Sequence, residues 1–233
     1  MSGIELATWN TEWISRSSEA FDRATKRIRQ LDSDILALTE VTTDLIPDGG
    51  QVVLGGDDWG YPSKGERRKV ALWSRWPVTD HASDLLDPPG RHIAATLASP
   101  LGAIRVHAVC IPWRDAHVRT GRKDSQPWEE HLRFLSSLSE LLADESQTDP
   151  TSRLPRIVLG DMNLRGGAHP YGSEETRQAW EQLLARECLA TCTPDEVIDK
   201  IALGEGLVAE SARTLPPNGI SDHHAVAATV NLT

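Results

Sequence analysis

Ile220-Ser-Asp-His-His-Ala-Val226 leads from a polar turn into an apolar run, Ala225–Val230, that predicts a β-strand. A second stretch has the reverse order, because the predicted strand Arg156–Leu159 runs into the polar end of Leu159-Gly-Asp-Met-Asn163. Taken alone, each stretch fits a structural role: the first as a cap on the final strand, the second as an Asx turn. Their significance depends on whether other strands end in the same way.

Polar residues do stand at the ends of other predicted strands. Asn10 follows the strand Ile4–Trp9, Glu40 follows Asp34–Leu38, and Asp199 lies in a later strand. A rigid sheet fixes where its loops project, so side chains at strand ends gather into sites. Carboxylate and amide oxygens suit a hard cation such as Mg²⁺. A further carboxylate can activate water, and an imidazole can stabilise developing charge. The pattern therefore predicts a metal-dependent site for phosphoryl transfer.

The hydrophobic pattern predicts many strands and a few helices, which is typical of a mixed layered fold with β-sheets in the core. No repeat or interdomain linker is evident, so we expect one domain over residues 1–233. Helices are expected over Ser18–Leu31, with Ser17 or Ser18 as N-cap, Trp128–Leu142 and Glu174–Glu187. The remaining strands are expected over Gln51–Leu54, Val70–Ser74, Ile93–Ala98, Ala103–Ile111 and Val197–Ala202. Ser99-Pro-Leu-Gly102 predicts a hairpin turn, and His117–Gln126, Asp144–Leu154 and Arg165–Ser173 are expected to be loops.

The bulk properties are those of an ordinary globular protein, with 233 residues and 39% hydrophobic content. Three cysteines do not imply a disulfide framework. The N-terminus has no signal-peptide pattern and no segment is long enough to span a bilayer, so we expect a cytoplasmic protein. The net charge of −10 argues against tight non-specific binding of duplex nucleic acid, although a local basic cluster can act against the global sign.

The motifs occur in the order found in the endonuclease/exonuclease/phosphatase superfamily, the DNase I-like group, which includes abasic-site endonucleases and inositol polyphosphate phosphatases. The sequence resembles that superfamily over nearly its whole length. The resemblance implies an α+β fold, a four-layered α/β sandwich in which two packed, mostly antiparallel β-sheets are flanked by helices. The matching segments are Thr8–Asn10, Leu38–Glu40, Val70–Val78, Leu159–Asn163, Val197–Ile201 and Ile220–Val226.

The resemblance also implies roles for the matched residues. Glu40 would be the principal carboxylate ligand of Mg²⁺ or Mn²⁺, Asn10 would hold phosphate or metal-bound water, and Asp222 would lie near the metal. Asp161 would orient or deprotonate the attacking water, and Asn163 would donate a hydrogen bond to the phosphate.

The last pair of implied catalytic residues is His223, which would stabilise charge on the phosphoryl oxygens, and Asp199, which would fix its tautomer. His224 neighbours this motif and is assigned a structural role or a place at the rim. One departure stands out, because Cys110 occupies a position where many members of the superfamily have His or Tyr. Either His107 or His117 could supply the missing group, or the group is absent.

The substrate is less clearly indicated than the reaction. Lys64–Lys69 and a loop containing Arg114, Arg119, Arg122 and Lys123 could contact phosphates, and Trp113 and Trp128 could stack on bases. The substrate-binding candidates are therefore His107, Trp113, Arg114 and His117. A nuclease acting on DNA or RNA is the favoured hypothesis. The alternatives are a phosphatase or phosphodiesterase on a small or lipid-borne phosphate ester and, with least support, a catalytically silent binding module. Endo- versus exonucleolytic cleavage, metal identity and oligomeric state stay open.

Overall fold

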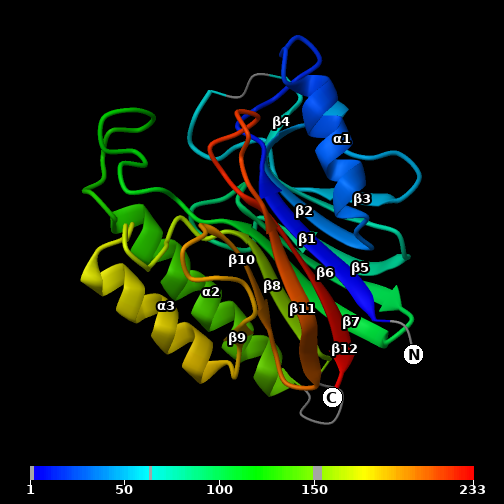
Figure 1. Ribbon diagram of the computed structural model, residues 1–233. Helices are drawn as coiled ribbons and strands as arrows, with labels where there is room; N and C mark the ends of the chain where they lie inside the picture. The colour runs from blue at the N-terminus through cyan, green and yellow to red at the C-terminus, as the bar shows by residue number, and fades with distance from the viewer. Residues whose placement is uncertain (1–2, 63–64, 149–153) are drawn as a thin grey trace.

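Two six-stranded β-sheets pack face to face in the computed structural model, which describes residues 3–62, 65–148 and 154–233 (Figure 1). The first sheet has the spatial order β11 (Leu207–Leu215), β12 (Ala225–Leu232), β1 (Ile4–Asn10), β2 (Ile35–Thr42), β4 (Arg67–Ser74) and β3 (Gln51–Leu54). The second has the order β5 (Val78–Ser83), β6 (His92–Ser99), β7 (Gly102–Cys110), β8 (Arg156–Asp161), β10 (Asp199–Leu203) and β9 (Ala190–Thr191).

Neighbouring strands in both sheets are mostly antiparallel. Within the described residues, β1 pairs with β2 in parallel in the first sheet, and β7 pairs with β8 in parallel in the second. With three helices on the outer faces, this architecture confirms the predicted α/β sandwich.

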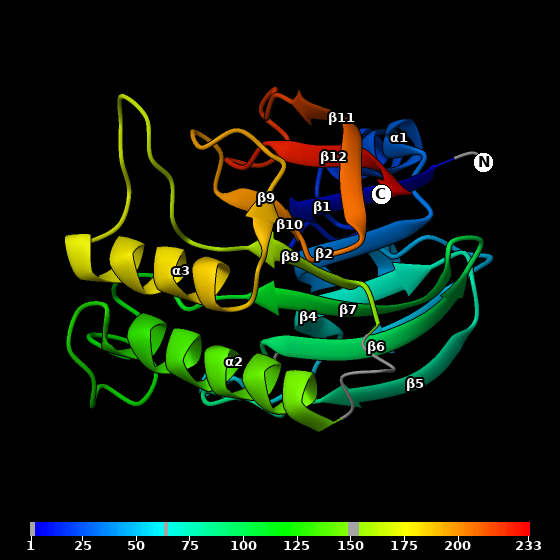
Figure 2. The ribbon, with the colours of Figure 1, turned by 90° about the horizontal axis from the view of Figure 1, so that it is seen from below.

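The helices form the outer layers (Figure 2). Helix α1 (Phe21–Leu31) covers the first sheet, while α2 (Glu129–Thr148) and α3 (Glu174–Arg186) lie side by side over the second. A short 3₁₀ turn, η1 (Thr43–Leu45), follows β2. Helix α1 buries Ala24, Ile28 and Leu31, which are spaced four and three residues apart and therefore share one face. Its predicted serine N-cap is wrong, since Ala20 occupies that position without a side-chain hydrogen bond.

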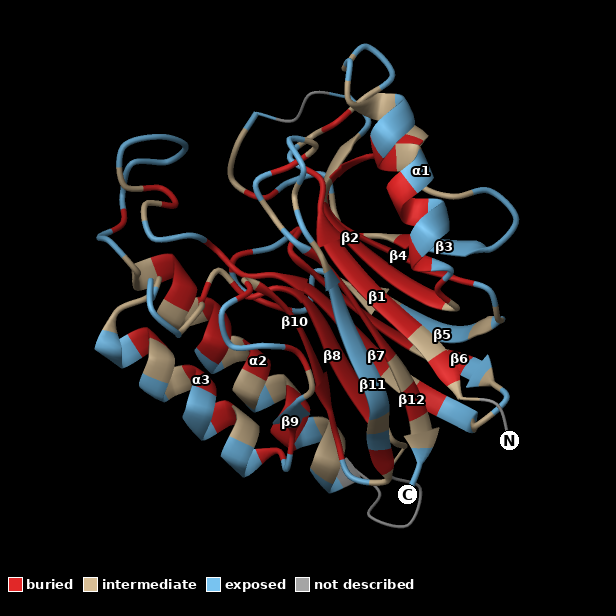
Figure 3. Ribbon diagram, in the orientation of Figure 1, coloured by how far each residue is buried: buried red, intermediate tan, exposed pale blue. Residues whose placement is uncertain are grey.

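Three apolar layers alternate with the sheets and helices, and the strands between them are largely buried (Figure 3). The central layer joins the inner faces of the two sheets and contains Leu6, Val106 and Ile201. The outer layers contain Trp9 beneath α1 and Trp180 on α3, and both are buried. The large buried area of the sheets holds the strand ends rigidly.

The structure corrects some of the predicted boundaries. Helix α2 runs to Thr148, so the predicted loop over Asp144–Leu154 is wrong for residues 144–148, while residues 149–153 lie outside the described residues. Strands β5 and β11 were not predicted. Both are mostly exposed, and their polar composition hides the alternation that a half-buried strand normally shows. The hairpin turn at Ser99–Gly102 is confirmed between β6 and β7.

The strands that carry the polar motifs end at the same edge of the sandwich. Asp199 at the start of β10 is in register with Asp161 at the end of β8. Strand β1, which ends at Asn10, lies in the opposing sheet and contacts both β8 and β10. Residues from the two sheets therefore meet at this edge.

Candidate active site

Asp161 forms the centre of the polar cluster at this edge. Its side chain is almost fully buried. Asn10 Nδ2 donates to its Oδ2 at 2.8 Å, and the backbone N–H of Asn163 donates to its Oδ1 at 2.8 Å. Burial raises the pKa of Asp161, against the lowering effect of the nearby His223 charge and the Asn10 hydrogen bond. The carboxylate is therefore fixed in orientation and more basic than an exposed aspartate.

Gly160, the residue before this aspartate, lies in a position that only glycine can occupy. Its φ is +143°, and a Cβ at this position would lie 1.9 Å from the carbonyl oxygen of Val109 on β7. Only glycine can adopt this backbone conformation so close to a neighbouring strand. The glycine allows β7 and β8 to approach where Asp161 enters the site.

The side chain of Asn163 also contacts the carboxylate of Asp161. Its φ is +47°, in the left-handed region that asparagine tolerates better than most residues. The side-chain amide donates to the carbonyl oxygen of Ile111 at 2.9 Å and to Asp161 Oδ2 at 3.2 Å. Both amide hydrogens are thus engaged, and the longer bond, to Asp161, is the weaker of the two.

His223 and Asp199 form a buried ion pair. The Nδ1 atom of His223 lies 2.5 Å from Asp199 Oδ2, and the His223 carbonyl accepts a hydrogen bond from Trp9 Nε1. Burial alone would lower the pKa of His223, but the Asp199 charge and hydrogen bond raise it to about 10. The imidazole is therefore protonated at neutral pH. Because Nδ1 is engaged by Asp199, Nε2 is the atom left to donate to a substrate.

Glu40 lies on β2 between Thr39 and Val41, which pair with Val70 and Arg68 on either side of Lys69 in β4. Its φ is +45°, an uncommon value for glutamate that interrupts the alternation of the strand. Lys69 Nζ lies 2.5 Å from Glu40 Oε1, and the Lys69 side chain is only 9% exposed. The ammonium group thus extends from the strand into the site. Lys64, at the other end of the predicted basic segment, lies outside the described residues.

The oxygen donors near Glu40 have the chemistry that a hard divalent cation requires. The Glu40 carboxylate is partly exposed, and Asn10 Oδ1 accepts the Glu12 N–H at 2.9 Å. Asp222 is 71% exposed and lies 3.6 Å from His223 Nε2. In the described residues, no group of three or more His, Cys, Asp or Glu side chains could enclose a metal. Mg²⁺ binds through one or two carboxylates and completes its shell with water and phosphate, so this donor set fits it.

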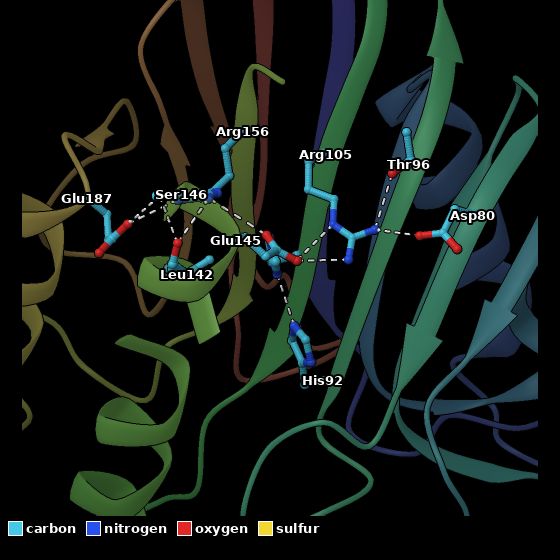
Figure 4. Close-up of polar contacts among 10 residues, drawn as sticks. Asp80, His92, Thr96, Arg105, Leu142, Glu145, Ser146, Arg156 and Glu187 are labelled. Carbon is cyan, nitrogen blue, oxygen red and sulfur yellow. Dashed lines mark hydrogen bonds and ion pairs between the residues drawn. The ribbon is translucent and has the colours of Figure 1, made fainter. Parts of the chain in front are cut away.

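The structure does not bring His107 to the site. Its side chain is fully buried on the face of β7 that packs against α2, where Nε2 lies 3.1 Å from Glu145 and Nδ1 lies 3.1 Å from His92. Figure 4 shows Glu145 between Arg105 and Arg156 in this polar network. The network joins α2 to the second sheet and is separate from Asp161.

The other predicted substrate-binding residues lie in the segment after β7. His117 is buried and stacks on Tyr61, with ring centroids 4.4 Å apart. Trp113 is 43% exposed and lines a pocket together with Lys69. Arg114 is exposed and pairs with Asp115 at 3.7 Å. Of these residues, Trp113 is the one that shares a pocket with a residue in direct contact with Glu40.

Cys110 is buried beside the site, in register with Asp161. Burial raises the pKa of its thiol, so it remains protonated and does not replace a histidine in acid–base chemistry.

The sequence did not indicate Tyr171, whose hydroxyl accepts the Arg114 N–H at 3.3 Å and whose ring packs against Trp128. Burial and the charge of Asp161 raise the pKa of Tyr171, although the Arg114 hydrogen bond opposes this shift. Its only sequence signal is an aromatic residue in a polar loop.

Comparisons with known proteins agree on one fold. The model of the Endonuclease/Exonuclease/phosphatase family matches residues 7–223. No curated protein matches the sequence. In the described residues, no helix is long and apolar enough to cross a membrane.

Several solved structures share the architecture at low sequence identity. A 3′ phosphatase, NExo, from Neisseria, bound to a product DNA hairpin, is 19% identical with a TM-score of 0.70, over 98% of this chain and 99% of that chain. The catalytic domain of human Nocturnin is 20% identical with a TM-score of 0.73, over 99% and 95%. Sphingomyelinase C from Streptomyces griseocarneus is 13% identical with a TM-score of 0.64, over 99% and 100%.

Proposed function

Because the chain belongs to the endonuclease/exonuclease/phosphatase family, we propose that it is a metal-dependent phosphoesterase that hydrolyses phosphodiester bonds in DNA or RNA. One observation carries this proposal. A buried, orientated carboxylate, Asp161, and a protonated imidazole, His223, lie at the same sheet edge as the Glu40 carboxylate. These are the groups that phosphodiester hydrolysis needs for activating water and for stabilising charge on phosphate.

Asp161 is the proposed base. Its raised pKa and fixed orientation suit it to align a water molecule and accept its proton. Asn10 and Asn163 hold both carboxylate oxygens, so the group does not have to reorganise during the reaction. Substrate binding would draw Asn163 from its longer bond with Asp161 to a phosphoryl oxygen.

His223 is the proposed electrostatic partner of the phosphate. Its Nε2–H donates to a non-bridging oxygen, and the positive charge opposes the negative charge that develops there. Asp199 maintains both the orientation and the protonation of the ring. Asp199 thus acts through His223 and is a positioning residue.

Glu40 is the proposed carboxylate ligand of Mg²⁺ or Mn²⁺, with Asn10 and Asp222 as the neighbouring oxygen donors. A bound divalent cation would neutralise phosphate charge and help to align the scissile bond. Lys69 contributes a fixed positive charge at the same place, because its ammonium group is held on Glu40. The charge of Lys69 would be shared between Glu40 and a substrate phosphate.

The nuclease proposal is favoured over the alternatives by the aromatic and basic residues beside Glu40, which are characteristic of nucleic-acid sites. The solved structure of the 3′ phosphatase from Neisseria is described with a product DNA hairpin. The same fold also supports sphingomyelinase C, so the test must include substrates other than nucleic acid.

Cleavage assays with single- and double-stranded DNA and RNA, in Mg²⁺, Mn²⁺ or chelator, test the proposal. A phosphomonoester, inositol phosphates and sphingomyelin form the comparison set. We expect metal-dependent cleavage of a nucleic acid, and a loss of about 10²- to 10⁴-fold in kcat for Asp161→Asn and for His223→Ala.

A matched control is His81→Ala, because His81 is exposed on β5 and outside the site. This variant should retain full activity. Wild-type turnover restricted to the comparison set would refute the nuclease proposal. Full activity in both site variants would show that the catalytic site lies elsewhere.

A further inference from the structure

A pocket rich in tryptophan lies directly beside Glu40. It encloses about 350 Å³, and Lys69, which lines it, is the residue paired with Glu40. Its walls come from the loop after β1, the β3–β4 connection, the start of β4 and the segment after β7. We call it the tryptophan pocket, and its principal lining residues are Trp13, Trp59, Tyr61, Trp113, Arg67 and Lys69.

Trp13 organises this pocket. Its ring stacks on Trp59 with centroids 5.7 Å apart and planes 21° apart. Arg67 Cζ lies 5.0 Å and Lys69 Nζ 5.1 Å from the centroid of Trp13, so two cations are held against one indole. The φ of Trp13 is +63°, which is strained for a bulky side chain. Such strain persists where the surrounding structure imposes it, and it occurs preferentially at functional sites.

Trp113 contributes the accessible aromatic surface. It is 43% exposed, whereas Trp59 is only 4% exposed and serves as a wall. In the described part of the chain no aromatic ring pairs with Trp113, whereas Trp13 pairs with Trp59 and Tyr61 pairs with His117. A flat ligand could therefore stack on Trp113 without displacing a neighbour.

We propose that the tryptophan pocket binds one unpaired base of a single-stranded nucleic acid, next to the phosphodiester held at Glu40 and His223. This inference rests on the proposed nuclease function and names its substrate class. Every base has an aromatic face that can stack on an indole. The phosphate beside that base carries the negative charge that Arg67 and Lys69 attract. A base and its phosphate together match the two kinds of side chain found in the pocket.

The same charges argue against other occupants. Aromatic pockets also bind quaternary ammonium groups such as choline, but Arg67 and Lys69 would repel a cation. A base within a duplex would first have to be unpaired and unstacked, at an energetic cost. The net charge of −10 also disfavours a long duplex interface. Single strands and frayed ends are thus the preferred substrates.

Tryptophan fluorescence provides a binding test that does not depend on turnover. The protein is titrated with AMP, ribose 5-phosphate and phosphocholine. We expect AMP to quench saturably and to bind at least about tenfold more tightly than ribose 5-phosphate, since stacking contributes a factor of this order per base. Trp113→Ala should weaken AMP binding about 10- to 100-fold. Leu232→Ala is the control, because the Leu232 side chain has the same 43% exposure and lies at the C-terminal end of β12, whereas the site lies at the N-terminal end of that strand.

Equal binding of AMP and ribose 5-phosphate, or tighter binding of phosphocholine than of AMP, would overturn the inference. An unchanged AMP affinity in Trp113→Ala would do the same.

Turnover on two matched strands separates this inference from the proposed function. One is a single-stranded DNA oligonucleotide and the other has the same length and backbone with tetrahydrofuran sites in place of the nucleosides. We expect wild-type kcat/KM to be about 10- to 100-fold higher on the base-bearing strand. In Trp113→Ala that ratio should fall toward one, while Leu232→Ala should retain it.

The outcomes are distinguishable. Equal cleavage of both strands by the wild type would overturn the assignment of the pocket and leave the nuclease proposal standing. Cleavage of neither strand and of none of the DNA and RNA substrates in the assays above, with AMP binding that depends on Trp113, would overturn the nuclease proposal and support the pocket as a nucleotide site.

Discussion

Replacement of Asp199 by Asn should remove the charge that keeps His223 protonated. The Asp199 carboxylate is 1% exposed and lies against the imidazole, so solvent does not screen their interaction effectively. Asparagine has nearly the same size and can still accept a hydrogen bond. The substitution therefore changes charge with little change in packing.

The expected loss of rate in Asp199→Asn follows from the pKa of His223, which Asp199 and the neighbouring carboxylates raise to about 10 despite burial. A histidine with a raised pKa keeps its proton, and its contribution to catalysis, up to that pKa. If the pKa of His223 returns to the ordinary histidine value of 6.5, about 3% of the rings are protonated at pH 8, which lowers the rate about 30-fold. Loss of the charge-assisted hydrogen bond adds a pH-independent decrease of about tenfold or more.

The assay is kcat/KM from pH 5.5 to 9 at saturating Mg²⁺, together with the NMR titration of the His223 ring. The wild type should show no loss of activity from deprotonation of His223 in this range. The variant should lose activity as pH rises above about 6.5 and recover part of it in acid. Asp195→Asn makes the same change in net charge at an exposed carboxylate and should behave as the wild type.

A wild-type pH profile in Asp199→Asn, or a His223 resonance that titrates at the wild-type pH, would refute the control of the His223 proton by Asp199. A pH-independent decrease alone would mean that Asp199 orients the ring without controlling its proton.

Three further predictions concern stability. Glu145→Gln removes one carboxylate contact from Arg105, His107 and Arg156, although Asp80 still pairs with Arg105 and Glu187 with Arg156, so the free energy of unfolding in urea should fall by about 2 kcal/mol; a decrease below 1 kcal/mol would contradict the role of the α2 network. Burial lowers the pKa of His131 to about 4 from 6.5, despite its hydrogen bond to the Pro112 carbonyl. The unfolded state therefore binds the proton first, and stability should fall by up to about 3 kcal/mol as pH decreases from 6.5 to 4. In His131→Asn this dependence should weaken, and parallel stability curves for the two proteins would contradict the assignment. Gly160→Ala places a Cβ against Val109, so it should lower the free energy of unfolding by about 3 kcal/mol; a thermal midpoint equal to the wild type would disprove that contact.

The strand-end residues were predictable because apolar runs mark buried strands directly. Asn10 and Asp161 are 151 positions apart, yet both follow such runs and the structure joins them by a hydrogen bond. The resemblance also implied that Asp199 acts on His223, and in the structure Asp199 Oδ2 lies 2.5 Å from His223 Nδ1. The sequence pattern was sufficient here because these side chains lie where strands end, and strand ends are visible in composition.

Other features depend on register and on which face of a strand a residue occupies. His107 was a candidate because of its place in the sequence, but its side chain faces α2, and no motif reports that orientation. The contact between Lys69 and Glu40 requires the pairing of β2 with β4. Tyr171 meets Arg114 and Trp128 through a loop whose course depends on tertiary contacts. Strand β11 was missed because its exposed residues do not alternate with buried ones.

The position of β1 between β2 and β12 has a consequence for synthesis. Strand β2 leaves the ribosome soon after β1, but β12 follows only after residues 11–224 have been added. At about 5–20 residues per second, β1 has no partner along one edge for roughly 10–40 s. An unpaired, apolar edge invites association with other chains. Nascent chains of this protein should therefore need protection by a chaperone until β12 is made. Truncation before Ala225 should turn the central strand β1 into a permanent, aggregation-prone edge strand.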